Sequence, residues 1–221
     1  MPLMPPVVRQ KRQKKPHGNG CDGAKNHNIA VSSFLDKIAS HFDRLAAAGA
    51  GQRSGAAAQM WVSAVDMHTG CPPGVEHIPK RVYRLIGAPR GSTLYWDQPL
   101  VVAAYGLTDL TGKPQYAQSA DRYIEAFLAR CVAGNGMFQW GNHRYYDVFD
   151  NRIVAFSGGD HELRPITPAW DLFWRHDPDR ISAYIRTMAR RHVYDPMSGG
   201  FNRHDDGKKG HAFLEAGGIL A

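Results

Sequence analysis

The sequence has 221 residues, a formal net charge of +7 and an apolar content of 43%, which is ordinary for a globular protein. It holds no run of about twenty apolar residues, which argues against a membrane-spanning protein. Residues 1–27 contain six basic residues and one acidic residue, so they carry +5 of the charge. The remaining +2 is too small to indicate a nucleic-acid-binding domain.

The first 28 residues differ in composition from the rest of the chain. They are rich in Pro, Lys, Arg, Gly and Asn, so we predict a disordered basic tail over residues 1–28. They lack the continuous apolar segment of a secretory signal peptide, which leaves the cytoplasm as the default compartment, with the periplasm or export as alternatives if the N-terminus is misassigned. Cys21, Cys71 and Cys131 form no CxxC pair, and this sparse pattern predicts reduced thiols rather than a disulfide framework.

Helical periodicity dominates the next part of the chain. Apolar residues recur at helical spacing from Ile29 to Ala48. Two further helices are expected, from Trp96 to Asp109 and from Gln115 to Val132, and the second of these has a strongly apolar face. Because only the turn Gly112-Lys113-Pro114 separates them, we expect an α-hairpin.

The start of this hairpin has its own sequence signals. Asp97 is a plausible N-cap, with Pro99 just inside the helix. The preceding stretch, Val82 to Gly91, shows no periodicity and is expected to be an irregular loop.

Helical segments continue toward the C-terminus. A short helix is expected from Pro168 to Trp174, a long one from Pro178 to about Val193, and a last one from His211 to Ala221. Successive helical hairpins without convincing strands predict an all-α fold, an α/α toroid or barrel. Because the last helix ends without a cap, we expect residues 29–221 to be the N-terminal part of such a domain, truncated at the C-terminus.

Three polar blocks interrupt the helical pattern, from Trp140 to Asp147, from Gly158 to Pro165 and from Gly199 to Gly207. Each contains glycine, which permits positive φ and lets the polar side chains turn into a shared cavity.

Candidate metal ligands in these blocks are His143, Glu162 and His204, with Arg203 beside them. Imidazole and carboxylate groups suit Mn, Zn or Fe. Their separations are far too long for two ligands on one helix. The spacing alone therefore leaves open whether these histidines bind a metal or are surface or structural residues.

Aromatic residues crowd the same region and allow two interpretations. They can stack on sugar rings or fill the core, and core filling is the more common role. The residues are Phe138, Trp140, Tyr145, Tyr146, Trp170 and Trp174.

Three short motifs carry a more specific resemblance. Trp140 to Arg144, His161 to Arg164 and Phe201 to His204 resemble, in order and approximate spacing, the motifs of the family-2 polysaccharide lyases. This resemblance covers roughly Met60 to Ala221, about the first half of a family member, and departs from the pattern at Asn142, which replaces a glycine. The family consists of pectate lyases with an (α/α)7 barrel.

The resemblance implies a site and a reaction. His143, Glu162 and His204 would hold a divalent metal, with Mn²⁺ favoured, Co²⁺, Ni²⁺ or Zn²⁺ acceptable and Ca²⁺ disfavoured. Arg203 would act as the base in β-elimination on α-1,4-galacturonan, which gives unsaturated uronates. The expected partner is an acidic polysaccharide or oligogalacturonate, with no nucleic acid and no membrane.

Other functions fit parts of the pattern. A glycoside hydrolase on an α/α toroid would need two carboxylates, and Asp147, Asp150, Asp160 and Asp171 are available. A non-haem iron oxygenase shares the ligand types but usually sits in a β-barrel. A lyase for another uronate, a nucleic-acid-binding tail and an inactive fragment complete the alternatives.

Overall fold

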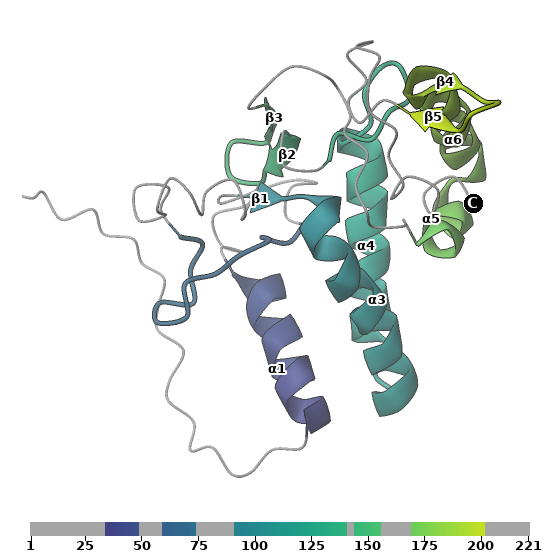
Figure 1. Ribbon diagram of the computed structural model, residues 1–221. Coiled ribbons are helices and arrows are strands. Elements are labelled where there is room, and N and C mark those ends of the chain that lie inside the picture. Colours follow the sequence, from purple (N-terminus) through teal and green to yellow (C-terminus); the bar gives the residue numbers. More distant parts are fainter. Residues whose placement is uncertain (1–33, 49–58, 74–90, 141–143, 156–168, 202–221) are drawn as a thin grey trace, which may run out of the picture.

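A computed structural model describes residues 34–48, 59–73, 91–140, 144–155 and 169–201. Over these ranges the protein is mostly helical, with a small antiparallel sheet and a two-stranded ribbon (Figure 1). The predicted tail over residues 1–28 and the predicted helix from His211 to Ala221 lie outside the described residues.

The predicted α-hairpin is confirmed as helices α3 (Leu94–Thr111) and α4 (Gln115–Arg130). Gly112 ends α3 in the left-handed conformation, with φ of 69°, which glycine adopts without steric cost. The predicted apolar face of α4 is buried along its length, from Tyr116 to Leu128.

Helix α1 (Phe34–Ala47) packs against this hairpin through aromatic side chains. Phe42 meets Trp61 and Tyr116 edge-on, with ring centroids 5.2 and 5.3 Å apart. Trp61 also stacks on Tyr123 at 4.7 Å. Aromatic pairs in these geometries contribute about 0.5–1.5 kcal/mol each beyond the burial of their area, so this cluster joins α1 to α4.

The expectation of an all-α fold is wrong in one respect. Strands β1 (Gly91–Ser92), β2 (Arg144–Asp147) and β3 (Arg152–Ala155) form an antiparallel sheet in the order β1-β2-β3. Sequence periodicity missed them because each is at most four residues long. Tyr, Val and Ile side chains on either side of a tight turn favour this hairpin.

Gly91 was predicted to end an irregular loop, but it pairs with Asp147 across the sheet. A Cβ atom at Gly91 would lie 1.9 Å from the carbonyl oxygen of Tyr146, a distance that no real side chain tolerates. Glycine is therefore required there so that the backbone of β1 can approach β2.

The C-terminal part of the described chain is a second helical hairpin followed by a ribbon. It comprises α5 (Trp170–His176), α6 (Pro178–His192), β4 (Val193–Asp195) and β5 (Gly200–Phe201). Asp177 caps α6, where its carboxylate accepts the N–H of Arg180 at 2.9 Å. Both predicted helices are confirmed to within a few residues, whereas the ribbon was not predicted.

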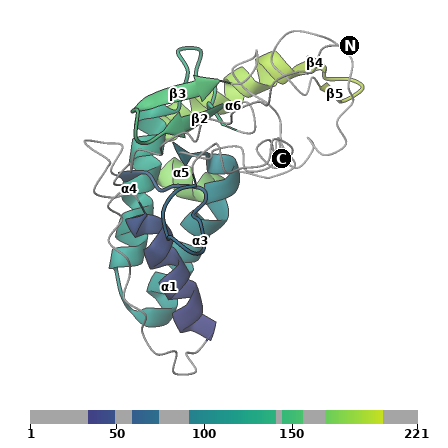
Figure 2. The same ribbon diagram turned by 90° about the vertical axis from the view of Figure 1, so that its left-hand side faces the viewer.

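The sheet β1-β2-β3 and the ribbon β4-β5 lie at the same end of the molecule. This is the end opposite the Gly112 turn, where α3 begins and α4 finishes, and both views agree on it (Figures 1 and 2). The described helices form hairpins of the kind that build a toroid. A closed α/α toroid is not established by them and stays a prediction.

The expectation of reduced thiols has a different outcome at each of two cysteines. Cys131 is a free, buried thiol, as expected. Cys71 is disulfide-bonded, so the prediction of reduced thiols is wrong for that residue. Among the described residues, none of the helices has the length and apolar character needed to cross a membrane.

The N-cap prediction for Asp97 is also wrong. Helix α3 begins at Leu94 with Thr93 as its N-cap, which puts Asp97 inside the first turn. There its carboxylate reaches back to accept the Thr93 N–H at 3.0 Å. This reversed contact fixes the start of the helix much as the second half of a capping box does.

The Asp97 carboxylate is buried and accepts hydrogen bonds from several segments of the chain. Ser63 donates to Oδ1 at 2.7 Å, while Ser92 and Tyr123 donate to Oδ2 at 2.6 and 2.7 Å. Burial raises the pKa of Asp97 to about 6, and these hydrogen bonds oppose the rise because they favour the ionised form. We call these residues the Asp97 network.

The Asp97 network predicts a specific pH dependence of stability. Because its pKa rises from 3.8 to about 6 on folding, the folded state binds the proton more tightly. The free energy of unfolding should therefore fall as the pH rises from about 4 to about 6. Against Asp97→Asn, the wild type should lose up to about 3 kcal/mol over that window.

Urea unfolding of both proteins at several pH values measures this difference. Asp66→Asn is the control with the opposite sign, because hydrogen bonds from the Thr69 and His68 backbone lower the pKa of Asp66. A gap between wild type and Asp97→Asn that stays constant with pH would contradict the prediction.

Candidate functional site

The predicted site residues His143, Glu162, Arg203 and His204 all lie outside the described residues. Their predicted roles are therefore untested by geometry. What the structure describes is the chain on both sides of the first two polar blocks and at the start of the third.

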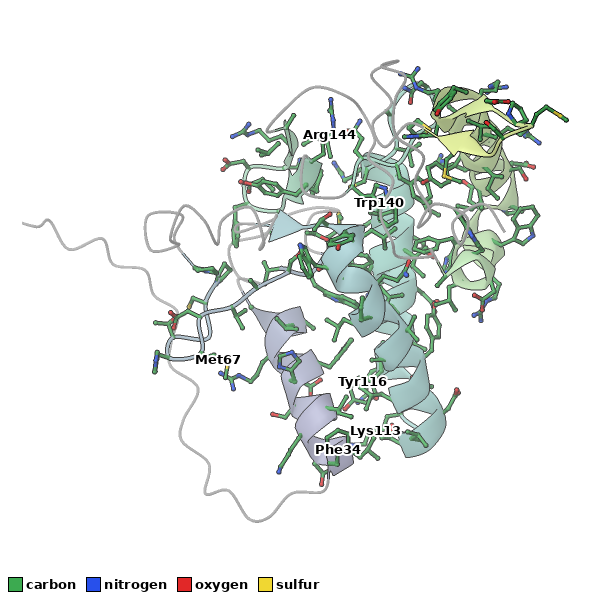
Figure 3. All side chains as sticks on the ribbon, in the orientation of Figure 1. Phe34, Met67, Lys113, Tyr116, Trp140 and Arg144 are labelled. Atoms are coloured by element: carbon green, nitrogen blue, oxygen red, sulfur yellow. The ribbon has the colours of Figure 1, made fainter. Side chains whose placement is uncertain are left out.

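The described flanks of the blocks converge on one end of the fold. The first block enters from Trp140 and leaves into β2 at Arg144, and both residues lie near the upper end of α4 (Figure 3). The second block follows β3, and the third begins in the ribbon at that same end, where its first residues form β5 (Figures 1 and 2). Whether the blocks themselves approach one another stays a prediction.

The backbone that enters the first block is held firmly. Val132 pairs with Phe138 in an isolated bridge, and the Gln139 N–H donates to the Cys131 carbonyl at 2.7 Å. Phe138 stacks on Tyr184 of α6 with centroids 3.9 Å apart. Trp140, 1% exposed, ends this segment inside the core. The chain is therefore fixed three residues before His143.

Arg130, the last residue of α4, anchors the hairpin that leaves the first block. Its Nη1 donates to the Tyr146 hydroxyl of β2 and to Asn151 Oδ1 in the turn, both at 3.3 Å. The Tyr146 hydroxyl also donates to Asn151. Asn151 has a φ of 53°, in the left-handed region that asparagine adopts more readily than most residues. One guanidinium group thus fixes both the strand and its turn.

Within the described part of the chain, two buried side-chain atoms have no hydrogen-bond partner: Arg130 Nε and Gln139 Oε1. A buried acceptor without a partner costs roughly 1–3 kcal/mol, and a bound ion or water can remove that cost. Gln139 lies four residues before His143. Gln139 Oε1 is a neutral oxygen of the kind that divalent transition metals accept together with imidazole and carboxylate groups.

The described carboxylates that a hydrolase would need are engaged locally. Asp147 Oδ1 accepts the N–H groups of Phe149 and Asp150 at 3.0 Å and shapes the hairpin turn. Asp150 pairs with Arg152 at 3.6 Å, and Asp171 with Arg175 at 3.8 Å. Asp160 lies outside the described residues. Within the described part of the chain, no cluster of three or more potential metal ligands occurs.

Most of the aromatic residues near the blocks fill the core. Phe138, Trp140, Tyr145 and Tyr146 are each at most 3% exposed. Trp170 packs on Tyr184 with centroids 5.7 Å apart, whereas Trp174 is 48% exposed. Sugar stacking is therefore not the role of the four buried rings.

Comparison with known protein families decides the family. Residues 91–214, more than half of the chain, match the family described as periplasmic pectate lyase. The chain belongs to this family. The matched range begins at Gly91, the glycine that pairs with β2, and it includes all three polar blocks.

In this pectate lyase family member, sequence reasoning missed two residues that hold the frame. The position of Asp97 near a helix start predicts a cap, because aspartate is common at that position. Arg130 was not singled out, because a basic residue in the last turn of a helix commonly interacts with the helix dipole. The sequence offers one signal for this frame. The glycine at position 91, next to Ser92, marks a place where two backbone segments come close together.

Replacing Arg130 should loosen the β2–β3 hairpin of this family member. Arg130→Met removes hydrogen bonds from a charged donor, each worth about 1.5–3 kcal/mol. Hydrogen exchange read by mass spectrometry should become faster in residues 144–155 and stay unchanged in α3.

Arg152→Met is the matched control on the same hairpin. Its side chain is 62% exposed and its partner Asp150 is 3.6 Å away, so it should have little effect. Equal protection of residues 144–155 in wild type and Arg130→Met would show that Arg130 does not anchor the hairpin.

Proposed function

We propose that the protein is a metal-dependent pectate lyase that cleaves α-1,4-polygalacturonate by β-elimination. The observation that carries this proposal is the family match over residues 91–214, which contains His143, Glu162, Arg203 and His204. Membership of the periplasmic pectate lyase family supports the lyase class and an acidic polysaccharide substrate.

The proposed ligands are His143, Glu162 and His204. Two imidazoles and one carboxylate suit Mn²⁺, Co²⁺, Ni²⁺ or Zn²⁺ better than Ca²⁺, which prefers an all-oxygen shell. When bound, such a cation supplies Lewis-acid stabilisation of the negative charge that develops on the uronate carboxylate.

Arg203 is the proposed base. It accepts the proton from C5 of the galacturonate unit, the C5–H electrons form the C4=C5 double bond, and the C4–O bond to the next sugar breaks. The leaving oxygen then takes up a proton to become the hydroxyl of the new end. Since arginine normally has a pKa above about 12, its neutral form needs nearby positive charge, which disfavours protonation.

The described frame supports these roles by limiting motion at the block ends. Trp140 and Arg130 hold the two sides of the first block, and the paired backbone of β4 and β5 holds the entry to the third. A base displaced by about 1 Å can lose two orders of magnitude in rate, so a rigid frame matters for this reaction.

An absorbance assay tests the proposed activity. The full chain with polygalacturonate and Mn²⁺ should give a steady rise in ultraviolet absorbance, because the new double bond is conjugated with the carboxylate. A chelator should abolish the rise, and added Mn²⁺ should restore it. Reducing ends without the absorbance would indicate a hydrolase and would overturn the proposal.

Arg203→Lys separates the base from the metal site. We expect kcat to fall about 10²–10⁴-fold, the range that a general base contributes. Mn²⁺ affinity, measured by calorimetry, should stay within a factor of about two, since Arg203 is not a proposed ligand. Arg122→Lys, on the exposed side of α4, is the matched control. Wild-type turnover in Arg203→Lys would remove Arg203 from the mechanism.

A further inference from the structure

Tyr194, in strand β4, presents an aromatic ring beside the third polar block. It is 39% exposed, unlike the buried tyrosines of the core. A Cβ atom at Gly200 would lie 2.6 Å from Tyr194 Cζ, so the ring rests directly over the Gly200 backbone. Gly200 precedes Arg203 by three residues. The ring therefore lies against the last described residues before Arg203 in the sequence.

Two of the exposed arginines of α6 precede this ring at helical spacing. Arg186 and Arg190 are four residues apart, so they share one helix face, and Tyr194 follows four residues later, just beyond the helix end. Within the described part of the chain, neither arginine is within ion-pair distance of a carboxylate. From Ile181 to Tyr194 the sequence contains no acidic residue at all.

The helix dipole explains only part of this charge. Cations in the last turn of a helix interact favourably with its negative end, and Arg190 stands in that turn of α6. Arg186 lies more than one turn before the end at His192, where the effect has faded. Arg190 Nη2 donates to Thr187 Oγ1 at 3.0 Å, which orients its guanidinium group on the surface.

A half-exposed aromatic ring on β4 and two exposed guanidinium groups on α6 offer the chemistry that a uronate unit needs. The C–H face of a sugar ring packs on an aromatic face, and a carboxylate accepts paired N–H bonds from arginine. Arginine suits this role better than lysine because its planar fork matches carboxylate geometry. A neutral sugar would use the ring but not the charges.

We propose that Tyr194, Arg186 and Arg190 form an outer subsite that binds a galacturonate unit of a long chain, beyond the units that a trimer fills at the cleavage site. The subsite rests on the proposed function for its substrate. It lies on α6 and β4, where the chain leads through β5 into the third block (Figure 1). It adds binding contacts to a long polygalacturonate chain and does not contact the reacting atoms.

Substrate length gives the decisive test. Initial rates are measured with polygalacturonate and with trigalacturonate for wild type, Tyr194→Ala and the double variant Arg186→Gln/Arg190→Gln. We expect KM for the polymer to rise about three- to tenfold in each variant, the range that one stacking or charged contact contributes. The kcat for the polymer and both constants for the trimer should change less than about twofold.

Matched variants test whether the effect comes from the Tyr194 hydroxyl or from a general loss of positive charge. Tyr194→Phe keeps the ring and should behave as wild type, and Arg122→Gln removes an equal charge from the exposed side of α4. The double variant should also show a weaker salt dependence of KM. Variants that match Arg122→Gln in KM, or that lose kcat with KM unchanged, would overturn the subsite.

Direct binding keeps the subsite and the lyase activity separate. Affinity electrophoresis in gels that contain polygalacturonate reports binding without turnover. If the wild type is retarded and Tyr194→Ala is not, yet no absorbance develops, then the proposed activity fails and the subsite stands. If the wild type cleaves the polymer and Tyr194→Ala keeps its KM and its retardation, the subsite fails and the activity stands.

Discussion

The buried carboxylate of Asp97 is the constraint on which the described fold depends. An ionised or partly ionised group in the core is costly unless donors surround it. Here those donors come from Ser63, Ser92, Tyr123 and the backbone of Thr93. They belong to separate parts of the chain, so the carboxylate is satisfied only when β1, the start of α3 and the middle of α4 are in register. An apolar contact would tolerate a small shift of these segments relative to one another, whereas the hydrogen bonds to Asp97 would be broken by it.

The alignment of β1 and α3 by the Asp97 network also positions the chain at the first polar block. Ser92 sits in β1, and β1 fits against β2 only because Gly91 lacks a side chain. Strand β2 begins directly after His143, and Arg130 locks its far end to α4 through Tyr146. The Asp97 carboxylate therefore acts on β2 through β1, and the Arg130 guanidinium acts on β2 through Tyr146. The frame of the first block is a consequence of buried polar chemistry more than of apolar packing.

Sequence reasoning found the long elements and missed the short ones, for a physical reason. Helix α4 was predictable because its buried side chains, from Tyr116 to Leu128, repeat at a fixed spacing. A strand of two residues such as β1 has no period to detect, and its identity comes from a partner more than fifty residues away. Asp97 shows the same limit, since a capping and a core aspartate look alike before burial is known. The blocks were recognised by motif, so their family was predictable, whereas the roles of His143, Glu162, Arg203 and His204 stay predictions.

The placement of the blocks at short strands has a chemical rationale. β-Elimination requires a base and a charge-stabilising site to meet one carbon, and both contributions fall steeply with small displacements. A long flexible connection would have to become ordered each time substrate binds, and this ordering would reduce the net binding free energy. Trp140 before the first block, and Gly200 under the Tyr194 ring before the third, fix the chain a few residues from the proposed ligands and base. The ordering cost is then met by folding, so the sugar chain needs to supply little of it on binding.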